Sequence, residues 1–404
     1  MQFNLKKFAI TFPVVLVFLE IITFLSTDMY LPALPQIGED FGMDQDMAQY
    51  TLTAWFMGSM SMQLFLGPIT EKFGRKMTMI IGIILFILAS FSCATSNNIN
   101  MFLLSRFIQG TTVCVVIVAG YATIHELYSG ARVIQIMAIM GSVTILAPAL
   151  GPFLGALIIT QGDWHNIFAL LTVSAMIGLL GVYYIMPSDG QKNIRRQTDK
   201  NDDGHLLASI KYYRAIFTNR KFMSFTLINC FNIICFFTWI VQSPFIIIET
   251  YQKSEIYFGL TQLFVFVSFI CGAQTAKLLI TKLSAKRLCE LGLTIVCSSI
   301  VLFIITSYMQ LQLELIITGM IGIAFGAAMQ SSLWNRLAIE SCEQPMAHRV
   351  AVYSTMVSFF ASLGSYLVTH LGDQTFLSLA MLMMGFVIIA VNIFFVVRST
   401  IKLA

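Results

Sequence analysis

The sequence predicts an all-α membrane protein of about twelve transmembrane helices in two pseudo-symmetric six-helix bundles. Of its 404 residues, 57% are hydrophobic and only 11% are charged, whereas a soluble domain carries roughly 25% charged residues. Apolar stretches of about 20 residues, each long enough to cross a bilayer as a helix, recur along the whole chain. One long polar stretch lies midway and leaves six apolar stretches on either side. Two such halves imply an internal repeat with a substrate site between them.

The predicted spans follow one another with short connections. The first comes after Lys6 and Lys7 and is too long for the apolar region of a secretory signal. It also lacks a small-residue cleavage site, so we expect it to be kept as a membrane helix. The spans are predicted at residues 12–35, 47–68, 77–96, 102–124, 133–159, 166–187, 222–247, 256–280, 288–307, 313–335, 349–370 and 375–397.

The basic residues predict the orientation of the chain. With a cytoplasmic N-terminus, all but two of the 24 Lys and Arg residues fall on the inner side. The exceptions are Lys253, on the outer side, and Arg106, within a span. Because cytoplasmic loops of membrane proteins are rich in Lys and Arg, we expect a multi-pass inner-membrane protein with both termini in the cytoplasm.

The polar stretch in the middle predicts the domain boundaries, with an N-terminal bundle at 1–188, a cytoplasmic linker at 189–221 and a C-terminal bundle at 222–404. The Gln-, Asn- and Asp-rich centre of this stretch is typical of a flexible linker. Its Lys and Arg residues could form a nucleic-acid site, but a loop at the cytoplasmic membrane surface explains them better. We expect the lipid bilayer as a partner, no nucleic acid, and a monomeric chain.

No enzyme chemistry is predicted. The chain has no hydrolase, zinc-protease or nucleotide-binding motif, so we expect no cofactor and no use of ATP. The five His residues are scattered, and the eight Cys residues form no CxxC pair. Most Cys residues lie within predicted spans, where packing is the ordinary role of a small apolar side chain. No metal site is predicted.

Two acids lie in the first predicted span, Glu20 and Asp28. A charge inside the bilayer costs several kcal/mol unless it is paired or hydrated. Eight residues separate the two acids by about 12 Å along a helix and by about 80° around it. Because burial and neighbouring charges decide whether a carboxylic acid holds its proton, the pair could link a proton gradient to substrate release. The alternative is that either acid makes only a structural polar contact.

Arg106 is the one basic residue within a predicted span. Arginine stays protonated in proteins, so it needs an acceptor when it is buried. Asp28 lies at a comparable depth and is the expected partner. An Asp28–Arg106 ion pair that weakens when Asp28 binds a proton would act as a coupling switch, and a purely structural ion pair is the alternative.

The turn at 67–76, GPITEKFGRK, predicts a gate on the cytoplasmic side. Its two glycines allow a tight turn and close approach of the backbone, and its acid can pair with a basic group or a helix N-terminus. The acid at the inner end of span 102–124 either relays protons or bonds to a neighbouring loop. The predicted gate comprises Gly67, Glu71, Gly74, Arg75, Lys76 and Glu126.

The segment at 147–155 places Pro148, Gly151, Pro152 and Gly155 inside one span. Proline kinks a helix, and glycine lets it pack closely on a neighbour. A kinked helix of this kind suits two halves that rock, although packing alone is the alternative.

In span 222–247, the segment at 239–244 places an aromatic ring, an amide and a proline at an expected cavity wall. The abundant Met and Phe residues suit an adaptable apolar pocket, although Phe facing lipid is the ordinary explanation for most of them. The residues predicted to line the substrate cavity are Tyr30, Tyr121, Phe236, Trp239, Ile240 and Gln242.

These motifs resemble those of the major facilitator superfamily, and within it the drug:proton antiporters of the MdfA and Bcr/CflA types. The turn at 67–76 matches the motif of the loop between spans 2 and 3, 106–110 matches the motif of span 4, and 147–155 matches the antiporter motif of span 5. The resemblance covers essentially the whole chain. One departure is Glu71, where the family usually has Asp.

The resemblance implies alternating access. It also implies that Glu20 and Asp28 share the binding of protons and cationic drugs, and that Arg106 interacts with Asp28. Lipophilic cations and neutral drugs are the cargo that it implies. We therefore expect proton-coupled antiport that exports small lipophilic or cationic compounds. The alternatives are a dedicated exporter of an endogenous metabolite such as a siderophore, uptake by proton symport, and a membrane sensor or scaffold without transport.

Overall fold

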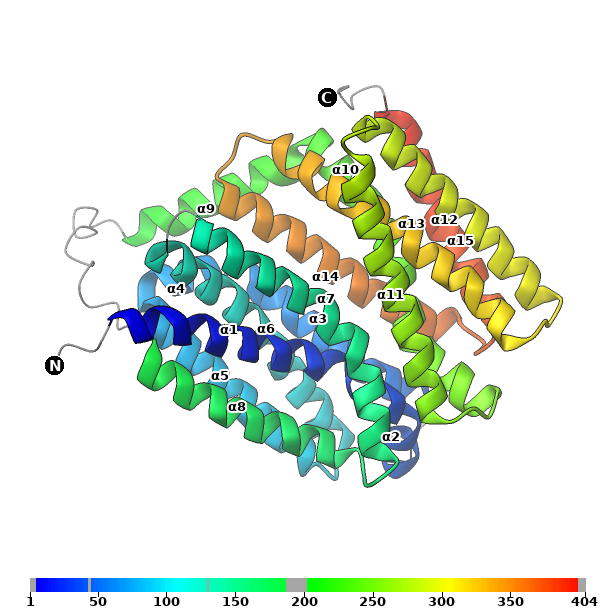
Figure 1. Cartoon of the computed structure of the whole chain (residues 1–404), viewed down its shortest axis with the longest axis horizontal. Coiled ribbons are helices and arrows are strands. Elements are labelled where there is room, and N and C mark those ends of the chain that lie inside the picture. Colours follow the sequence, from blue (N-terminus) through cyan, green and yellow to red (C-terminus); the bar gives the residue numbers. More distant parts are fainter. Residues whose placement is uncertain (1–4, 43–44, 129–130, 187–201, 399–404) are drawn as a thin grey trace. The chain divides into compact units, whose positions relative to one another are not determined.

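The computed structural model describes residues 5–42, 45–128, 131–186 and 202–398, and its regular structure within these ranges is entirely helical (Figure 1). Each of the twelve predicted spans coincides with a helix. Ten of these helices are long and apolar enough to cross a membrane, or eleven if the bent helix α7 counts as one span. The remaining predicted span, 47–68, coincides with the more polar helix α3 (Gln45–Gln63).

The chain divides into two compact units. Unit 1 comprises Met1–Tyr30 and Ala54–Lys211, and unit 2 comprises Leu31–Thr53 and Tyr212–Ala404. The boundaries predicted from the sequence, 1–188 and 222–404, stay a prediction. Residues 189–201 of the predicted linker lie outside the described part of the chain, but its second half forms helix α9 (Asp202–Thr218).

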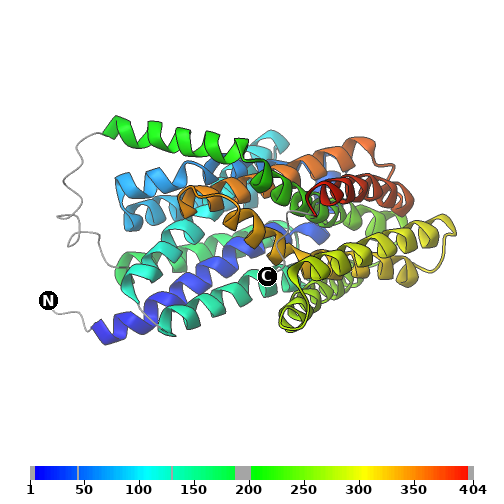
Figure 2. The same cartoon turned by 90° about the horizontal axis from the view of Figure 1, so that it is seen from above.

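Unit 1 is a bundle in which helix α1 packs against α6, α7 and α8 (Figure 2). Its core is formed by apolar side chains of α1 such as Phe12, Leu16 and Leu19, which meet Met79 and Val116 of neighbouring helices. The helices of this unit are α1 (Leu5–Asp28), the second half of α3, α4 (Leu66–Phe73), α5 (Arg75–Ala94), α6 (Ile99–Leu127), α7 (Ala131–Ile159), α8 (His165–Ile185) and the first part of α9.

Unit 2 is built around helix α10, which packs against α13, α14 and α15. Nearly every side chain in the second half of α10 is buried, so this helix forms the centre of the unit. The elements of this unit are η1 (Leu31–Ala33), α2 (Leu34–Asp40), the first half of α3, the last part of α9, α10 (Arg220–Pro244), η3 (Phe245–Thr250), α11 (Glu255–Leu279), α12 (Ala285–Tyr308), α13 (Leu313–Glu340), α14 (Met346–Leu371) and α15 (Phe376–Val397).

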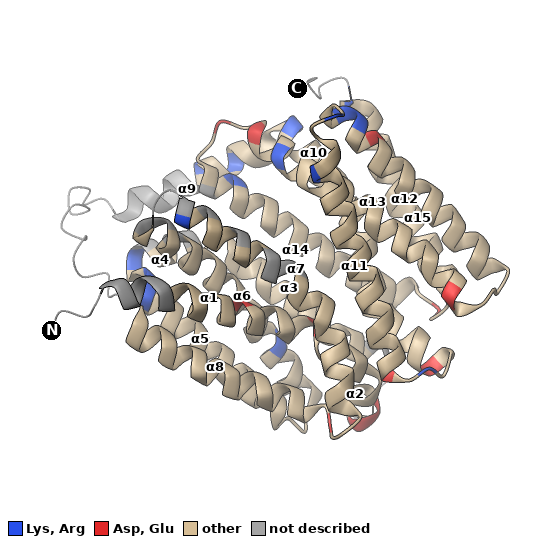
Figure 3. Ribbon diagram, viewed as in Figure 1, with Lys and Arg blue, Asp and Glu red and all other residues tan. Residues whose placement is uncertain are grey.

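Charged residues lie mainly at the ends of the described helices, and the middle of these helices carries few of them (Figure 3). This distribution is what a bilayer requires, because a charge in the hydrocarbon region is costly. The exceptions in unit 1 are the fully buried Glu20 and Arg106 and the nearly buried Asp28. These three residues therefore need a specific explanation.

Candidate functional site

The first span is broken at Asp28. Helix α1 ends at this residue, and the chain then passes through two turn residues and the short helix η1 before α2 begins. The run Phe12–Asp40 still counts as one apolar span, in agreement with the span predicted at 12–35, but the sequence did not predict the local interruption of the α-helix after Asp28. Pro32 and Pro35, which lack the backbone N–H of an ordinary helical residue, lie just beyond it. Asp28 is therefore a buried acid at the end of an interrupted membrane helix, where backbone carbonyl groups are left without helical partners.

Arg106 of α6 binds this broken helix end. Its Nη1 donates to the backbone carbonyl of Ser26 at 2.9 Å and to Oε1 of Gln109. The guanidinium carbon lies 4.1 Å from the centre of the Tyr30 ring and 5.7 Å from that of Phe168. A cation at the C-terminal end of a helix is favoured by the helix dipole, and the aromatic faces add cation–π attraction.

The predicted ion pair between Asp28 and Arg106 is wrong for this structure. No nitrogen of Arg106 lies within 4.0 Å of an Asp28 oxygen, and Asp28 makes no hydrogen bond or ion pair in the described part of the chain. The prediction failed because the carbonyl of Ser26, freed by the helix break, takes the place of the carboxylate. The charge of Arg106 nevertheless acts on Asp28, and Nε and Nη2 of Arg106 make no hydrogen bond to described residues.

Glu20 lies deeper in α1 and is fully buried. The hydroxyl group of Tyr121, from α6, donates to its Oε1 at 2.7 Å. Tyr121 was predicted as a cavity residue, and the structure places it in direct contact with one of the two predicted acids. Helices α1 and α6 are thus joined by two polar contacts, one at Glu20 and one at the end of α1.

Two predicted glycines of α7 lie against the broken end of α1. A Cβ atom added to Gly151 would lie 2.9 Å from Cβ of Asp28, and one added to Gly155 would overlap the carbonyl oxygen of Met29. The missing side chains therefore let α7 approach the backbone at Asp28 and Met29. Helix α7 also bends by 40° between its parts Gln135–Gly141 and Leu146–Ile159. Pro148 lies directly after this bend, where proline disrupts the preceding turn.

The predicted gate motif is described in part. Gly74 has a φ of +81° and separates α4 from α5, a conformation that glycine adopts without strain. Lys76 donates to the carbonyl oxygens of Tyr183 at 2.8 Å and Met186 at 2.5 Å. It therefore caps the C-terminal end of α8, a role that the sequence did not reveal. Arg75 begins α5 and Gly67 lies in α4, whereas the side chains of Glu71 and Glu126 lie outside the described part of the chain.

The predicted cavity residues of α10 are buried within unit 2. Nε1 of Trp239 donates to Oε1 of Gln262 at 3.2 Å, and its ring stacks on Phe376 at 5.7 Å. Phe236 packs edge-on against Phe266. Ile240 and Gln242 are also buried. Their part in a substrate cavity, like that of Tyr30, stays a prediction.

Sequence reasoning missed two residues that hold Arg106. Gln109 accepts from Arg106 and donates through Nε2 to Oγ of Ser90 at 2.9 Å. A signal for Gln109 was present, because it lies three residues after Arg106 and so on the same face of the helix. Phe168 gave no such signal, since only the packing of α8 against its neighbours brings it near Arg106.

Comparison with known proteins assigns the family. The family model described as Major Facilitator Superfamily matches residues 16–367. The chain is 30% identical over 360 residues to the chloramphenicol resistance protein CraA of Acinetobacter baumannii, covering 88% of this chain and 85% of that protein. It is 32% identical over 289 residues to the multidrug transporter MdfA of Edwardsiella ictaluri, covering 72% of this chain and 69% of that protein.

Solved structures agree on the fold. The crystal structure of a D-xylose–proton symporter superposes with a TM-score of 0.76 at 15% identity and covers 95% of this chain and 96% of that chain. A bacterial homologue of the human lysosomal transporter Spinster superposes with a TM-score of 0.71 at 12% identity and covers 99% and 98%. The protein is therefore not an enzyme but a multi-pass membrane transporter of small molecules, and it belongs to the major facilitator superfamily.

Proposed function

We propose that this protein exports small lipophilic or cationic compounds in exchange for protons, with Glu20 and Asp28 as the acids that bind the protons. The observation that carries the proposal is the burial of both carboxylic acids in one interrupted helix. A permanent charge is costly in that environment. An acid that can be protonated avoids this cost, which makes each acid suited to bind and release a proton during a transport cycle.

Arg106 supports a coupling role because it is held near Asp28 without being paired to it. The contacts to Ser26 and Gln109 keep the guanidinium group in place, and two of its nitrogens make no hydrogen bond to described residues. A protonated Asp28 leaves this arrangement unchanged. A deprotonated Asp28 is attracted to Arg106, so loss of the proton favours movement of the α1 end towards α6.

Glu20 supports recognition of cationic cargo. Its Oε1 accepts a hydrogen bond from Tyr121, which orients the carboxyl group. A lipophilic cation that reaches Glu20 compensates its negative charge as a proton does. Competition between the cation and a proton for the same acid then couples export to proton entry. The names of the relatives, a multidrug transporter and a chloramphenicol resistance protein, support a drug-like cargo that includes neutral molecules.

A transport assay on the purified, reconstituted chain tests the proposal. Liposomes with an acidic lumen should accumulate a fluorescent lipophilic cation such as ethidium, and a protonophore should abolish the accumulation. The double variant Glu20→Gln/Asp28→Asn should show no gradient-dependent accumulation. Accumulation that requires an acidic exterior instead would indicate symport and contradict the proposal. A chain that moves neither cations nor chloramphenicol under any gradient would favour a dedicated metabolite exporter.

A further inference from the structure

Helix α9, which leads into the first span of unit 2, presents a face that combines apolar and basic side chains. Ile210 and Phe217 are 55% and 40% exposed, and their spacing of seven residues places them on one side of the helix. Arg214 lies between them on the same side, four residues after Ile210. We call Ile210, Arg214 and Phe217 the outer face of α9.

The outer face is surrounded by positive charge. Lys211, Arg220 and Lys221 are also exposed, and no acid lies between Lys211 and Lys221 in the sequence. Neither these residues nor Arg214 forms an ion pair within 4.0 Å in the described ranges. Four cations within eleven residues, without anionic partners among the described residues, create a site for an external anion.

The opposite face of the second part of α9, from Tyr212 onwards, packs within unit 2. Ile216 is fully buried, and the rings of Tyr212 and Tyr213 lie 5.1 Å and 5.0 Å from that of His348, at the start of α14. Just after α9, Asn219 Nδ2 donates to the carbonyl oxygen of Ser341 at 3.3 Å. Because the opposite side of the helix is packed, Arg214 and Phe217 of the outer face have fixed positions.

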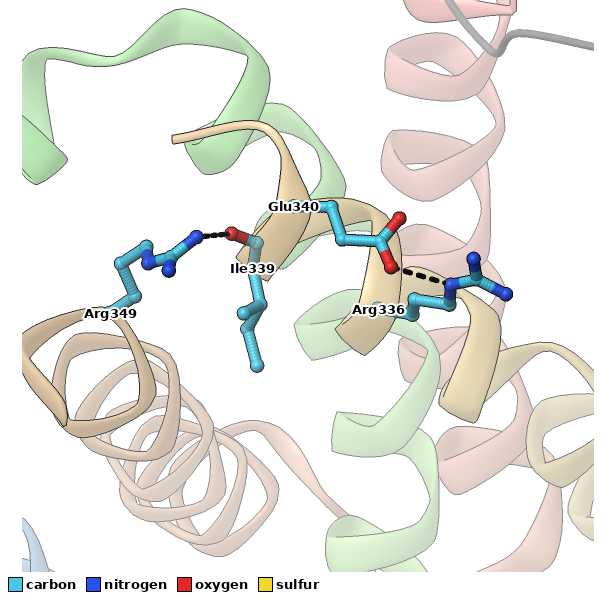
Figure 4. Close-up of polar contacts among 4 residues, drawn as sticks. All are labelled: Arg336, Ile339, Glu340 and Arg349. Atoms are coloured by element: carbon cyan, nitrogen blue, oxygen red, sulfur yellow. Dashed lines mark hydrogen bonds and ion pairs between the residues drawn. The ribbon is translucent and has the colours of Figure 1, made fainter. Parts of the chain in front are cut away.

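The end of α13 next to these contacts is itself well held. Arg349, which follows His348, donates through Nη1 to the carbonyl oxygen of Ile339 (Figure 4). The same nitrogen also donates to the carbonyl oxygen of Cys342 at 2.6 Å. The neighbouring Arg336 is paired with Glu340 at 2.7 Å, also visible in Figure 4. Arg336 thus differs from Lys211, Arg214, Arg220 and Lys221, because an acid of the protein already neutralises it.

The position of α9 next to a membrane-spanning helix indicates which partner its outer face binds. Helix α9 ends at Thr218 and the membrane-spanning helix α10 begins at Arg220. Phe217 is therefore about one helical turn from the residue at which the chain enters the membrane. Apolar side chains beside Lys and Arg are the composition of helices that lie in the membrane interface and bind anionic lipids. We propose that the outer face of α9 binds the headgroup and upper acyl chain of an anionic phospholipid.

A fluorescence-quenching experiment on the full chain in nanodiscs tests this assignment. Phe217→Trp places a reporter on the outer face, and the unsubstituted chain, whose four tryptophans are buried, is measured alongside. Brominated phosphatidylglycerol should quench the reporter more strongly than brominated phosphatidylcholine at equal content. The preference should fall at high salt, because exposed charges are then screened.

Charge variants in the Phe217→Trp background complete the test. Arg214→Gln and Lys221→Gln should each lower the preference for the anionic lipid about fivefold. Arg214→Lys should retain it, which guards against a variant that merely misfolds. Arg336→Gln, which removes a cation already paired with Glu340, should leave it unchanged.

Three results would overturn the assignment. Equal quenching by both lipids would mean that only ordinary surrounding lipid covers the face. No quenching by either lipid would mean that protein, such as a second copy of the chain, covers it. A preference that survives both glutamine substitutions would place the anion elsewhere. These readouts measure lipid contact and do not depend on whether the chain exchanges protons for drugs.

Discussion

At the residue scale, the proposed mechanism depends on Arg106, which binds the end of helix α1 and forms no ion pair with the nearby Asp28. Arg106 satisfies the carbonyl of Ser26 and is itself held by Gln109. Asp28 lies close enough to be influenced by the charge of Arg106, yet it makes no ion pair with it. A tight ion pair would hold Asp28 in its charged form, so the separation favours exchange of a proton.

Replacement of Asp28 by Asn should separate folding from coupling. Because the contacts of Arg106 to Ser26 and Gln109 do not involve Asp28, we expect the variant to fold with a melting temperature close to that of the unsubstituted chain. Proton-driven transport in liposomes should be lost entirely, since the amide cannot take up a proton. Strong destabilisation would indicate a structural Asp28–Arg106 pair, and normal driven transport would remove Asp28 from the proposed mechanism.

Replacement of Glu20 by Gln should distinguish cargo by charge. Loss of a charge-assisted contact should weaken binding of lipophilic cations about ten- to hundredfold, while binding of neutral compounds should change far less. Equilibrium binding to purified protein measures both. Tyr121→Phe is the matched control, because it removes the hydrogen bond to Glu20 but keeps the charge, so cation binding should fall much less. An equal loss for both classes of compound would contradict charge matching at Glu20.

At the element scale, the interrupted helix α1 and the bent helix α7 form one packing unit. The α-helix is interrupted after Asp28, and Gly151 and Gly155 of α7 lie against Asp28 and the backbone of Met29. The antiporter-like segment at 147–155 therefore has a physical role in this fold, because it allows α7 to approach the residue that we propose to bind protons. A change of proton occupancy at Asp28 then acts directly on the contact between two helices.

A single methyl group should test this contact. Gly155→Ala places Cβ on the carbonyl oxygen of Met29, so one helix must move, at a cost of about 1–3 kcal/mol. We expect a lower melting temperature and reduced transport. Gly141→Ala on the same helix meets nothing within 4 Å and should be neutral or slightly stabilising, because alanine favours helices. Equal behaviour of the two variants would contradict close packing at the break.

The sequence predicted the spans because lipid imposes a length and an apolar composition on each of them. It did not predict the end of α1 at Asp28, since the apolar stretch continues past this residue to the following prolines. The partner of Arg106 was missed for the same reason, because the carbonyl of Ser26 becomes available only when the helix stops. Gln109 could have been found from its spacing to Arg106, whereas the Tyr121–Glu20 contact depends on how two distant helices pack.

In the linker, the composition of the sequence did not predict the helix that forms there. Its polar composition predicted a flexible segment, and the second half, Asp202–Thr218, forms α9. The buried Ile216 and the ring contacts to His348 stabilise this helix through packing, which composition alone does not reveal. The outer face of α9 could be identified only from the structure, because the structure shows which side of the helix is packed.

At the scale of the whole molecule, the chain has the major facilitator fold, and the charge distribution predicts its orientation. Lys and Arg are concentrated on the side predicted to be cytoplasmic, with Lys253 on the outer side and Arg106 within a span as the exceptions. Reporter fusions test this directly. Green fluorescent protein at the C-terminus should fluoresce, and alkaline phosphatase fused after Lys253 should be active. The reverse pattern would place both termini outside and invert the proposed direction of export.

The most direct test of the central claim is the release of protons when cargo binds. The purified chain, in weakly buffered detergent solution with a pH indicator, is titrated with a lipophilic cation at a pH where the two acids are protonated. The account predicts that the unsubstituted chain releases protons, that Glu20→Gln and Asp28→Asn each reduce the release, and that the double variant abolishes it. Saturable binding of the cation without any proton release, or release that persists in the double variant, would contradict it.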